Sequence, residues 1–213
     1  IVLMGIFAPQ IAEMPKGYGS DILLDPGAGR ILGTDNLGLD IFGEIVWGAR
    51  TSLYVSFIAV FVAMVIGLPA GLVAGYKKGR IGTVIDAVID IFLTLPMLPL
   101  MIVISAIVGS SIINVSIVIG IFSWPSLARV TRNATLKISE MQYIEAAKCL
   151  NIPSHKIVFK HILLNAAGPV LVNLTLIMAT AVLSESGLSF LGLGDPTTWS
   201  WGTILKKAWD ASA

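Results

Sequence analysis

Long apolar runs separated by polar segments give the chain its pattern and predict helices that cross a membrane. The longest run, residues 52–75, contains no charged side chain, and roughly 20 apolar residues suffice for a helix to cross the hydrocarbon core. Further runs predict spans over about 84–108, 115–127 and 162–183. Residues 1–8 are apolar but too short to span. We interpret them as the end of a truncated first transmembrane helix, and a cropped signal peptide is the alternative.

The polar segments between these runs predict the extramembrane parts. Residues 9–50 contain Gly, Pro and Asp clusters, which favour a loop with at most short helices. Residues 129–161 are polar and amphipathic and form a second loop. Residues 184–213 contain Gly, Pro and three of the five tryptophans, and we expect no further helix within them.

Composition indicates an integral membrane protein. Only 13% of the residues are charged and 55% are hydrophobic, whereas soluble domains contain about 25% charged residues. The predicted fold class is therefore all-α, a polytopic bundle of transmembrane helices. The net charge of +1 gives no indication of a nucleic-acid partner. Since Cys149 is the single cysteine, no internal disulfide can form.

The distribution of Lys and Arg predicts the orientation, because cytoplasmic loops are enriched in these residues. Residues 77–80 and 129–161, taken as one side, contain nine of them, whereas 9–50 and 184–213 contain five that are diluted by acids. We therefore expect the 129–161 loop in the cytoplasm and the other two segments outside. The nine are Lys77, Lys78, Arg80, Arg129, Arg132, Lys137, Lys148, Lys156 and Lys160.

The cytoplasmic loop is predicted to be a helix–turn–helix at the membrane surface. Asn151 tolerates the left-handed conformation that ends many helices. Pro153 cannot continue the first helix, and Ser154 is a good N-cap for a second one. Two interpretations remain open here, an amphipathic membrane anchor or a docking element for a cytoplasmic protein. The apolar face of the first helix, over residues 137–150, is expected to hold Ile138, Met141, Ile144 and Cys149.

Part of this loop resembles the EAA loop of ABC importer permeases. Residues 143–151 read Tyr-Ile-Glu-Ala-Ala-Lys-Cys-Leu-Asn, followed by Ile157 and by His-Ile-Leu at 161–163. The family pattern is Glu-Ala-Ala followed by a Gly and later by Ile-x-Leu-Pro. Asn151 stands at the Gly position, which is a mild change because Asn also adopts left-handed helix ends. Leu164 stands where Pro usually follows, and we expect this to straighten the entry to the last span.

Five other stretches narrow the resemblance to the C subunits of dipeptide and oligopeptide permeases. One of them reads Gly-Thr-Asp-Asn-Leu-Gly-Leu-Asp, with Leu39 where the family has Arg. Together the stretches cover nearly the whole chain in the family's order. They are residues 33–40, 48–53, 123–129, 188–194 and 199–202.

The resemblance implies a bundle of the type I ABC importer permease kind, with residues 51–213 as its transmembrane domain. It implies a permease subunit of the cytoplasmic membrane that imports dipeptides or oligopeptides by alternating access. The implied partners are a homologous permease in a heterodimer, two cytoplasmic ATPase subunits and an external binding protein. Family relatives return through one more helix, so we expect a final helix beyond residues 184–213.

The chain itself is expected to be no enzyme and to hold no metal or other cofactor. It has no Gly-x-x-x-x-Gly-Lys-Ser/Thr phosphate loop, so ATP would be bound and hydrolysed by partner subunits. An intramembrane enzyme also lacks candidates. His155 and His161 are the only histidines, and they lie in the cytoplasmic loop outside any HExxH frame.

The resemblance also assigns ATPase docking to a set of loop residues. Ala146 and Ala147 are expected to leave a low surface that slides into a groove of the partner, and Glu145 to pair with a basic group there. The full set is Tyr143, Glu145, Ala146, Ala147, Asn151, Ile152 and Pro153.

Polar residues near the membrane provide further candidates. Asn173, Thr180 and Glu185 are candidates for the translocation path, with interhelical hydrogen bonding or a structural role as the open alternatives. Asp86 and Asp90 are four residues apart and so share one helical face. Acids inside a membrane are candidate functional groups, and these two support the alternative of a proton-coupled carrier or channel. Their closeness to the basic residues 77–80, where they can reach water, favours a plain interfacial role over this alternative.

Overall fold

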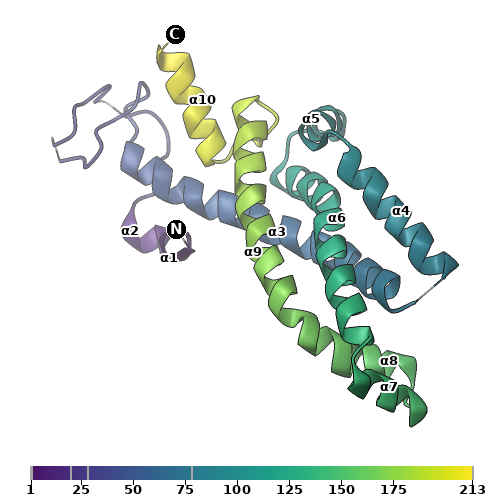
Figure 1. The fold of residues 1–213 in the computed structure, drawn as a ribbon. Coiled ribbons are helices and arrows are strands. Elements are labelled where there is room, and N and C mark those ends of the chain that lie inside the picture. The colour runs from purple at the N-terminus through teal and green to yellow at the C-terminus, as the bar shows by residue number, and fades with distance from the viewer. Residues whose placement is uncertain (1, 20, 28, 78, 213) are drawn as a thin grey trace. The chain divides into compact units, whose positions relative to one another are not determined.

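The computed structural model describes residues 2–19, 21–27, 29–77 and 79–212, so Lys78 of the basic count lies outside the described residues. The regular elements within this part are helices, and one isolated bridge joins Thr34 and Asp40 in the irregular segment between α2 and α3. The elements, labelled in Figure 1, are α1 Val2–Ile6, α2 Ala8–Ile11, α3 Ile41–Tyr76, α4 Arg80–Thr94, α5 Met97–Val108, α6 Ile112–Ser139, α7 Gln142–Cys149, α8 Ser154–Lys156, the π-helix η1 Ile157–Ile162, α9 Leu163–Phe190 and α10 Trp201–Ser212.

Three helical stretches in the described residues are long and apolar enough to cross a membrane. They are Ile41–Tyr76, Ile112–Ser139 and Ser154–Phe190, and a fourth span results if α4 and α5 count together. The sequence predicted one span over 84–108, but α4 and α5 meet at an angle of 86°. The physical reason is Pro96, because the residue before a proline avoids the helical region. Leu95 accordingly has φ −72° and ψ 141°, which is extended backbone.

Two other helices differ from the prediction: α3 begins earlier than expected, and α10 lies where no helix was expected. α3 begins at Ile41, so its first ten residues belong to the segment predicted as an external loop. The expectation of no further helix in 184–213 was wrong, because α10 occupies Trp201–Ser212. Residues 1–8, predicted as the end of a first span, contain α1, and α2 begins at Ala8.

The chain forms two compact units, which divide α3, α5, α6 and α9 between them. The first contains the residues up to 57, 102–116 and 181 onward, and the second contains 58–101 and 117–180.

In the second unit, a stripe of small residues brings α3 and α6 into close contact. Gly67, Gly71 and Gly75 are spaced four apart on α3, and a Cβ atom on any of them would lie 2.5–2.7 Å from a backbone oxygen of α6. Small residues at this spacing allow membrane helices to pack backbone to backbone. The facing oxygens belong to Trp124, Ala128 and Arg132.

We expect Gly71→Ala to destabilise the second unit by about 1–3 kcal/mol, the usual cost of overpacking a close contact. The added Cβ would lie 2.5 Å from the Ala128 oxygen and 2.6 Å from the Thr131 Cβ. Thermal melting of the purified permease in detergent measures the effect. Gly168→Ala on α9 is the matched control, because a Cβ there meets no atom within 4 Å. Equal melting temperatures for the two variants would contradict this packing.

In the first unit, tryptophan indoles bind α10 and the N-terminal segment to the beginning of α3. Lys207 of α10 lies 3.7 Å from the buried carboxylate of Glu44 and 3.5 Å from the ring centroid of Trp199. Each of three indole N–H groups donates to a backbone oxygen of the same unit. These bonds join Trp47 to Ala12 at 3.1 Å, Trp199 to Pro15 at 3.2 Å and Trp201 to Ile45 at 3.1 Å.

Candidate functional site

The candidate docking loop is a short helix and turn between two long helices. α6 continues to Ser139, so the first eleven residues of the predicted 129–161 loop belong to this long helix. α7 follows, and Asn151 ends it with a φ of 56°, which confirms the predicted left-handed residue. Pro153, with ψ 137°, takes the N-cap position that was predicted for Ser154. Its carbonyl accepts the N–H groups of Lys156 and Ile157, so Ser154 becomes the first helical residue.

The helix from Ser154 onward runs without interruption into the last span, through the π-helix η1. The effect of Leu164, in place of a proline, on this entry stays a prediction. A π-helix is rare, and it often accompanies a functional site.

α7 is fixed to the protein by its own apolar side. Ile144 and Ala147 are buried together with residues of α3, α6, η1 and α9, so α7 packs directly against these elements. We name this group the loop core. Its buried members are Leu72, Ile138, Ile144, Ala147, Ile157, Ile162 and Ala166.

The burial of Ala147 corrects its predicted role as a docking contact. Its side chain is only 6% exposed and packs in the loop core, so it holds α7 in place from the inside. Cys149 and Met141 were expected on the apolar face, but both are exposed. For Cys149 the reason is helical spacing, because position 147 follows Ile144 by three residues and shares its face, whereas position 149 does not. Met141 is the N-cap of α7 and precedes its first turn.

The outer side of α7 presents a mixed acidic and apolar surface. Glu145 and Ala146 are exposed, as predicted for docking residues. Beside them, Tyr143 is 44% exposed and Leu150 is 77% exposed. Leu150 was not among the predicted residues, although an apolar residue directly before a helix-ending Asn in a polar loop was a usable signal. Of the other predicted residues, Asn151 and Pro153 are exposed and Ile152 packs partly against the loop core.

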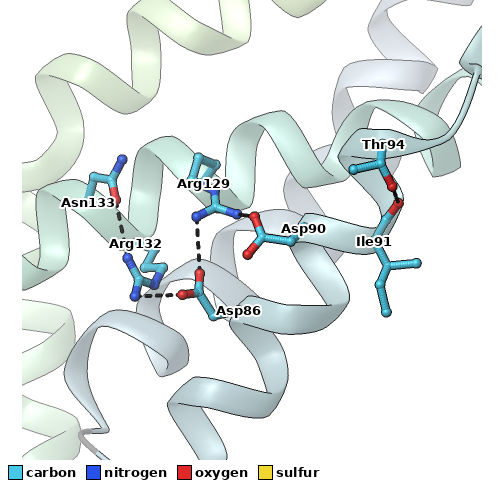
Figure 2. Close-up of polar contacts among 7 residues, drawn as sticks. All are labelled: Asp86, Asp90, Ile91, Thr94, Arg129, Arg132 and Asn133. Carbon is cyan, nitrogen blue, oxygen red and sulfur yellow. Dashed lines mark hydrogen bonds and ion pairs between the residues drawn. The ribbon is translucent and has the colours of Figure 1, made fainter.

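A second polar cluster, also in the second unit, joins α4 to α6 (Figure 2). Arg132 Nη2 lies 2.7 Å from Asp86 Oδ2, and Arg129 Nη1 lies 3.3 Å from Asp86 Oδ1. Arg129 also pairs with Asp90. The sequence placed both arginines in a loop and both aspartates on one helical face, but it did not predict their pairing. Each carboxylate faces a guanidinium, which agrees with an ion-pair role of the two aspartates between α4 and α6.

The three predicted path residues are distributed over both units. Asn173 approaches Ser126 Oγ at 3.5 Å, and Thr180 donates to the carbonyl oxygens of its own helix. Both belong to the second unit. Glu185 belongs to the first, is 3% exposed, and accepts hydrogen bonds from Ser52 at 2.9 Å and Ser189 at 2.7 Å. A role of these residues in the path stays a prediction.

We expect Glu185→Ala to destabilise the first unit by about 1–3 kcal/mol, because it leaves the buried hydroxyls of Ser52 and Ser189 without their acceptor. Glu185→Gln keeps an acceptor oxygen and should lower the stability of the first unit less than Glu185→Ala. Melting temperature and uptake are measured together for both variants. If Glu185→Gln reduced uptake without lowering the melting temperature, the residue would act in the path and not only in the structure.

The orientation can be tested at exposed positions on opposite sides. We expect a membrane-impermeant maleimide to label native Cys149 only in inverted vesicles, because the basic count places α7 in the cytoplasm. In a Cys149→Ser background, Thr197→Cys should react in intact cells. Both positions are exposed, so access and not burial decides the result. Labelling of Cys149 in intact cells would reverse the orientation.

Comparisons with known proteins agree over most of the chain. The family model described as "Binding-protein-dependent transport system inner membrane component" matches residues 67–203. The dipeptide transport system permease protein DppC of Alkalihalophilus pseudofirmus is 39% identical over 97% of this chain and 69% of its own length. The oligopeptide transport system permease protein OppC of Bacillus subtilis is 34% identical over 96% of this chain and 68% of its own length.

A solved structure confirms the predicted fold class. A chain of the MetNI methionine ABC transporter, in an inward-facing conformation, matches with a TM-score of 0.68 over 77% of this chain and 79% of that chain. Its sequence identity is 23%, so it informs the fold alone. The fold is the transmembrane helical bundle of an ABC importer permease. The chain therefore belongs to the family of binding-protein-dependent transport system inner membrane components, and it is a multi-pass permease subunit of the cytoplasmic membrane.

Proposed function

We propose that this permease imports dipeptides or oligopeptides and is driven by ATP that separate subunits bind and hydrolyse. The observation that carries the proposal is the construction of α7. Its inner side is fixed in the loop core, while its outer side presents Glu145 and Ala146 between the apolar Tyr143 and Leu150. A membrane anchor needs no exposed carboxylate in the middle of its apolar surface, whereas a protein groove with a basic rim fits this surface.

The peptide cargo is supported by the names of relatives. DppC of Alkalihalophilus pseudofirmus is named for dipeptide transport and OppC of Bacillus subtilis for oligopeptide transport. The partners in this proposal are a homologous permease, two ATPase subunits at the cytoplasmic side and an external binding protein. The family description, binding-protein-dependent transport, supports the last of these.

The second unit suggests how a push on α7 would move the spans. Ile144 and Ala147 connect α7 to α6, α9 and the end of α3 through the loop core. Arg129 and Arg132 connect α6 in turn to α4. Since these contacts are rigid packing and ion pairs, we infer that α4 and α6 move together when an ATPase displaces α7.

Uptake in a deletion strain tests the cargo. We expect cells that lack this gene to lose uptake of radiolabelled dialanine or of a longer alanine peptide, and a plasmid copy to restore it. Uptake of labelled nickel and of a disaccharide in the same strain serves as the control for other classes of cargo. Unchanged peptide uptake with a loss of nickel or sugar uptake would reject peptides as the cargo.

A further inference from the structure

An apolar groove of about 420 Å³ lies in the second unit, between the last turns of α3 and the segment formed by α8 and η1. Leu68, Leu72 and Val73 line it from α3, and Val158 and Phe159 line it from η1. Phe159 is 62% exposed and Val73 is 36% exposed, so the walls face outward. The groove is separate from the outer side of α7 that the proposed function uses.

The π-helix shapes one wall of this groove. Ile157 and Ile162 at the two ends of η1 are buried in the loop core, with exposed fractions of 1% and 0%. Val158 and Phe159, between them, line the groove; Phe159 is exposed, and Val158 also packs partly against the loop core. The same short segment thus seals the interior and provides an outward apolar surface.

One end of the groove is polar and basic. Tyr76, Lys77, Ser154 and His155 line it there, and the described lining contains no acidic side chain. The ammonium group of Lys148 lies 5.7 Å from the ring centroid of Tyr76, which adds a further positive charge close by. An occupant with an apolar body and an anionic end would complement this charge distribution.

The length of the groove matches one leaflet of a membrane. From Leu68 to Tyr76, where α3 ends beside Lys77, the helix advances about 12 Å, at about 1.5 Å per residue. Half of a hydrocarbon core of about 30 Å is about 15 Å. A groove that begins beside Lys77 and ends at Leu68 therefore extends from the headgroup level to near the midplane.

We propose that the groove binds an anionic phospholipid of the adjacent leaflet. One acyl chain lies between α3 and η1, and Lys77 and His155 bind the phosphate. Basic pockets beside membrane helices on the cytoplasmic side bind anionic headgroups in this way. Because α8 and η1 follow α7 directly, the lipid supports the back of the helix that carries the proposed docking surface. The inference does not depend on which cargo the permease carries.

Photo-crosslinking in nanodiscs tests the proposal. The permease, with the subunits that accompany it on extraction, is reconstituted with phosphatidylglycerol that carries a diazirine on its acyl chain. We expect adducts on residues 68–77 and 154–159. Lys77→Gln should lower the adduct about fivefold, the change that corresponds to about 1 kcal/mol for one basic residue, and Lys77→Arg should retain it.

Matched variants and a neutral lipid complete the test. Val73→Trp fills the groove and should remove the adduct, whereas Val65→Trp, on an exposed turn of α3 outside the groove, should leave it unchanged. Phosphatidylcholine with the same chains should crosslink about fivefold less, for the same electrostatic reason. Three results would each overturn the proposal. The two lipids could label the groove equally, or the residues around Val65 could be labelled as strongly as the groove. The groove could also carry no adduct because a protein subunit covers it.

Discussion

Glu145→Lys is expected to abolish peptide uptake while the permease remains in the membrane at its normal level. Glu145 is exposed near the middle of α7, so the substitution changes the outer surface and leaves the loop core intact. Removing one partner of a desolvated charge pair typically costs about 2–5 kcal/mol, and a reversed charge adds repulsion. At about 1.4 kcal/mol per tenfold change in affinity, the ATPase should bind at least tenfold more weakly.

Co-purification of the ATPase and uptake by cells are measured together for this variant. Glu13→Lys is the matched control, because it makes the same chemical change at an exposed position that the basic count places outside. Leu150→Asp, at the other end of the same surface, should weaken the ATPase in the same way. If Glu145→Lys and Leu150→Asp both kept the ATPase and wild-type uptake, α7 would be a membrane anchor only.

The burial of Ala147 changes what a bulky substitution there would report. Ala147→Trp would force a large ring into the loop core beside Ile144, so it should lower the melting temperature as well as uptake. Glu145→Lys should lower uptake alone. The two variants thus separate a loss of docking from a loss of structure.

Asp86→Arg is expected to have the largest effect on stability, because it would bring three guanidinium groups together between α4 and α6. The side chains of Asp86, Arg129 and Arg132 are 22–27% exposed. Exposed pairs contribute up to about 1 kcal/mol, and breaking a buried pair costs about 3–5 kcal/mol. Because most of each of these three side chains is buried, the loss of stability should approach the cost of breaking a buried pair. The yield of monodisperse permease after extraction measures this loss of stability.

Two further variants make this prediction specific. Asp90→Asn should cost less than about 1 kcal/mol, because Asp90 is 61% exposed and such pairs are weak. Asp86→Arg combined with Arg132→Asp restores opposite charges across the 2.7 Å contact and should recover part of the yield. Equal yields for Asp86→Arg and Asp90→Asn would show that the cluster does not hold α4 to α6.

Several features of the fold could be predicted from the sequence because they depend on local physics. The uncharged run 52–75 is long enough to require a membrane helix, and α3 covers all of it. Asn151 was predicted to end α7 because few residues other than Gly tolerate a positive φ, and its φ is 56°. The sequence predicted one span over 84–108, which the structure breaks before Pro96. The angle of 86° between the two parts depends on tertiary packing, which a proline alone does not determine.

Pairings between distant elements could not be predicted in the same way. Arg129 and Asp86 are 43 residues apart, and hydropathy gave only the helices that carry them. The inward side of α7 was predicted from Ile138, Met141, Ile144 and Cys149, because apolar residues usually mark the buried face. Ile138 and Ile144 are buried as predicted, whereas Met141 and Cys149 are exposed. The structure also buries Ala147, since a small residue fits where α7 lies close to the other helices. A surface helix this short offers too few positions for periodicity to decide its orientation.

Uptake into proteoliposomes tests the central claim most directly. The permease, its homologous permease, the two ATPases and the binding protein are reconstituted together, and labelled dialanine uptake is followed. We predict uptake that requires both ATP and the binding protein, and that Glu145→Lys abolishes under the same conditions. Uptake driven by an imposed pH gradient without ATP, and unchanged by Glu145→Lys, would contradict the assignment as a permease subunit of an ATP-driven importer.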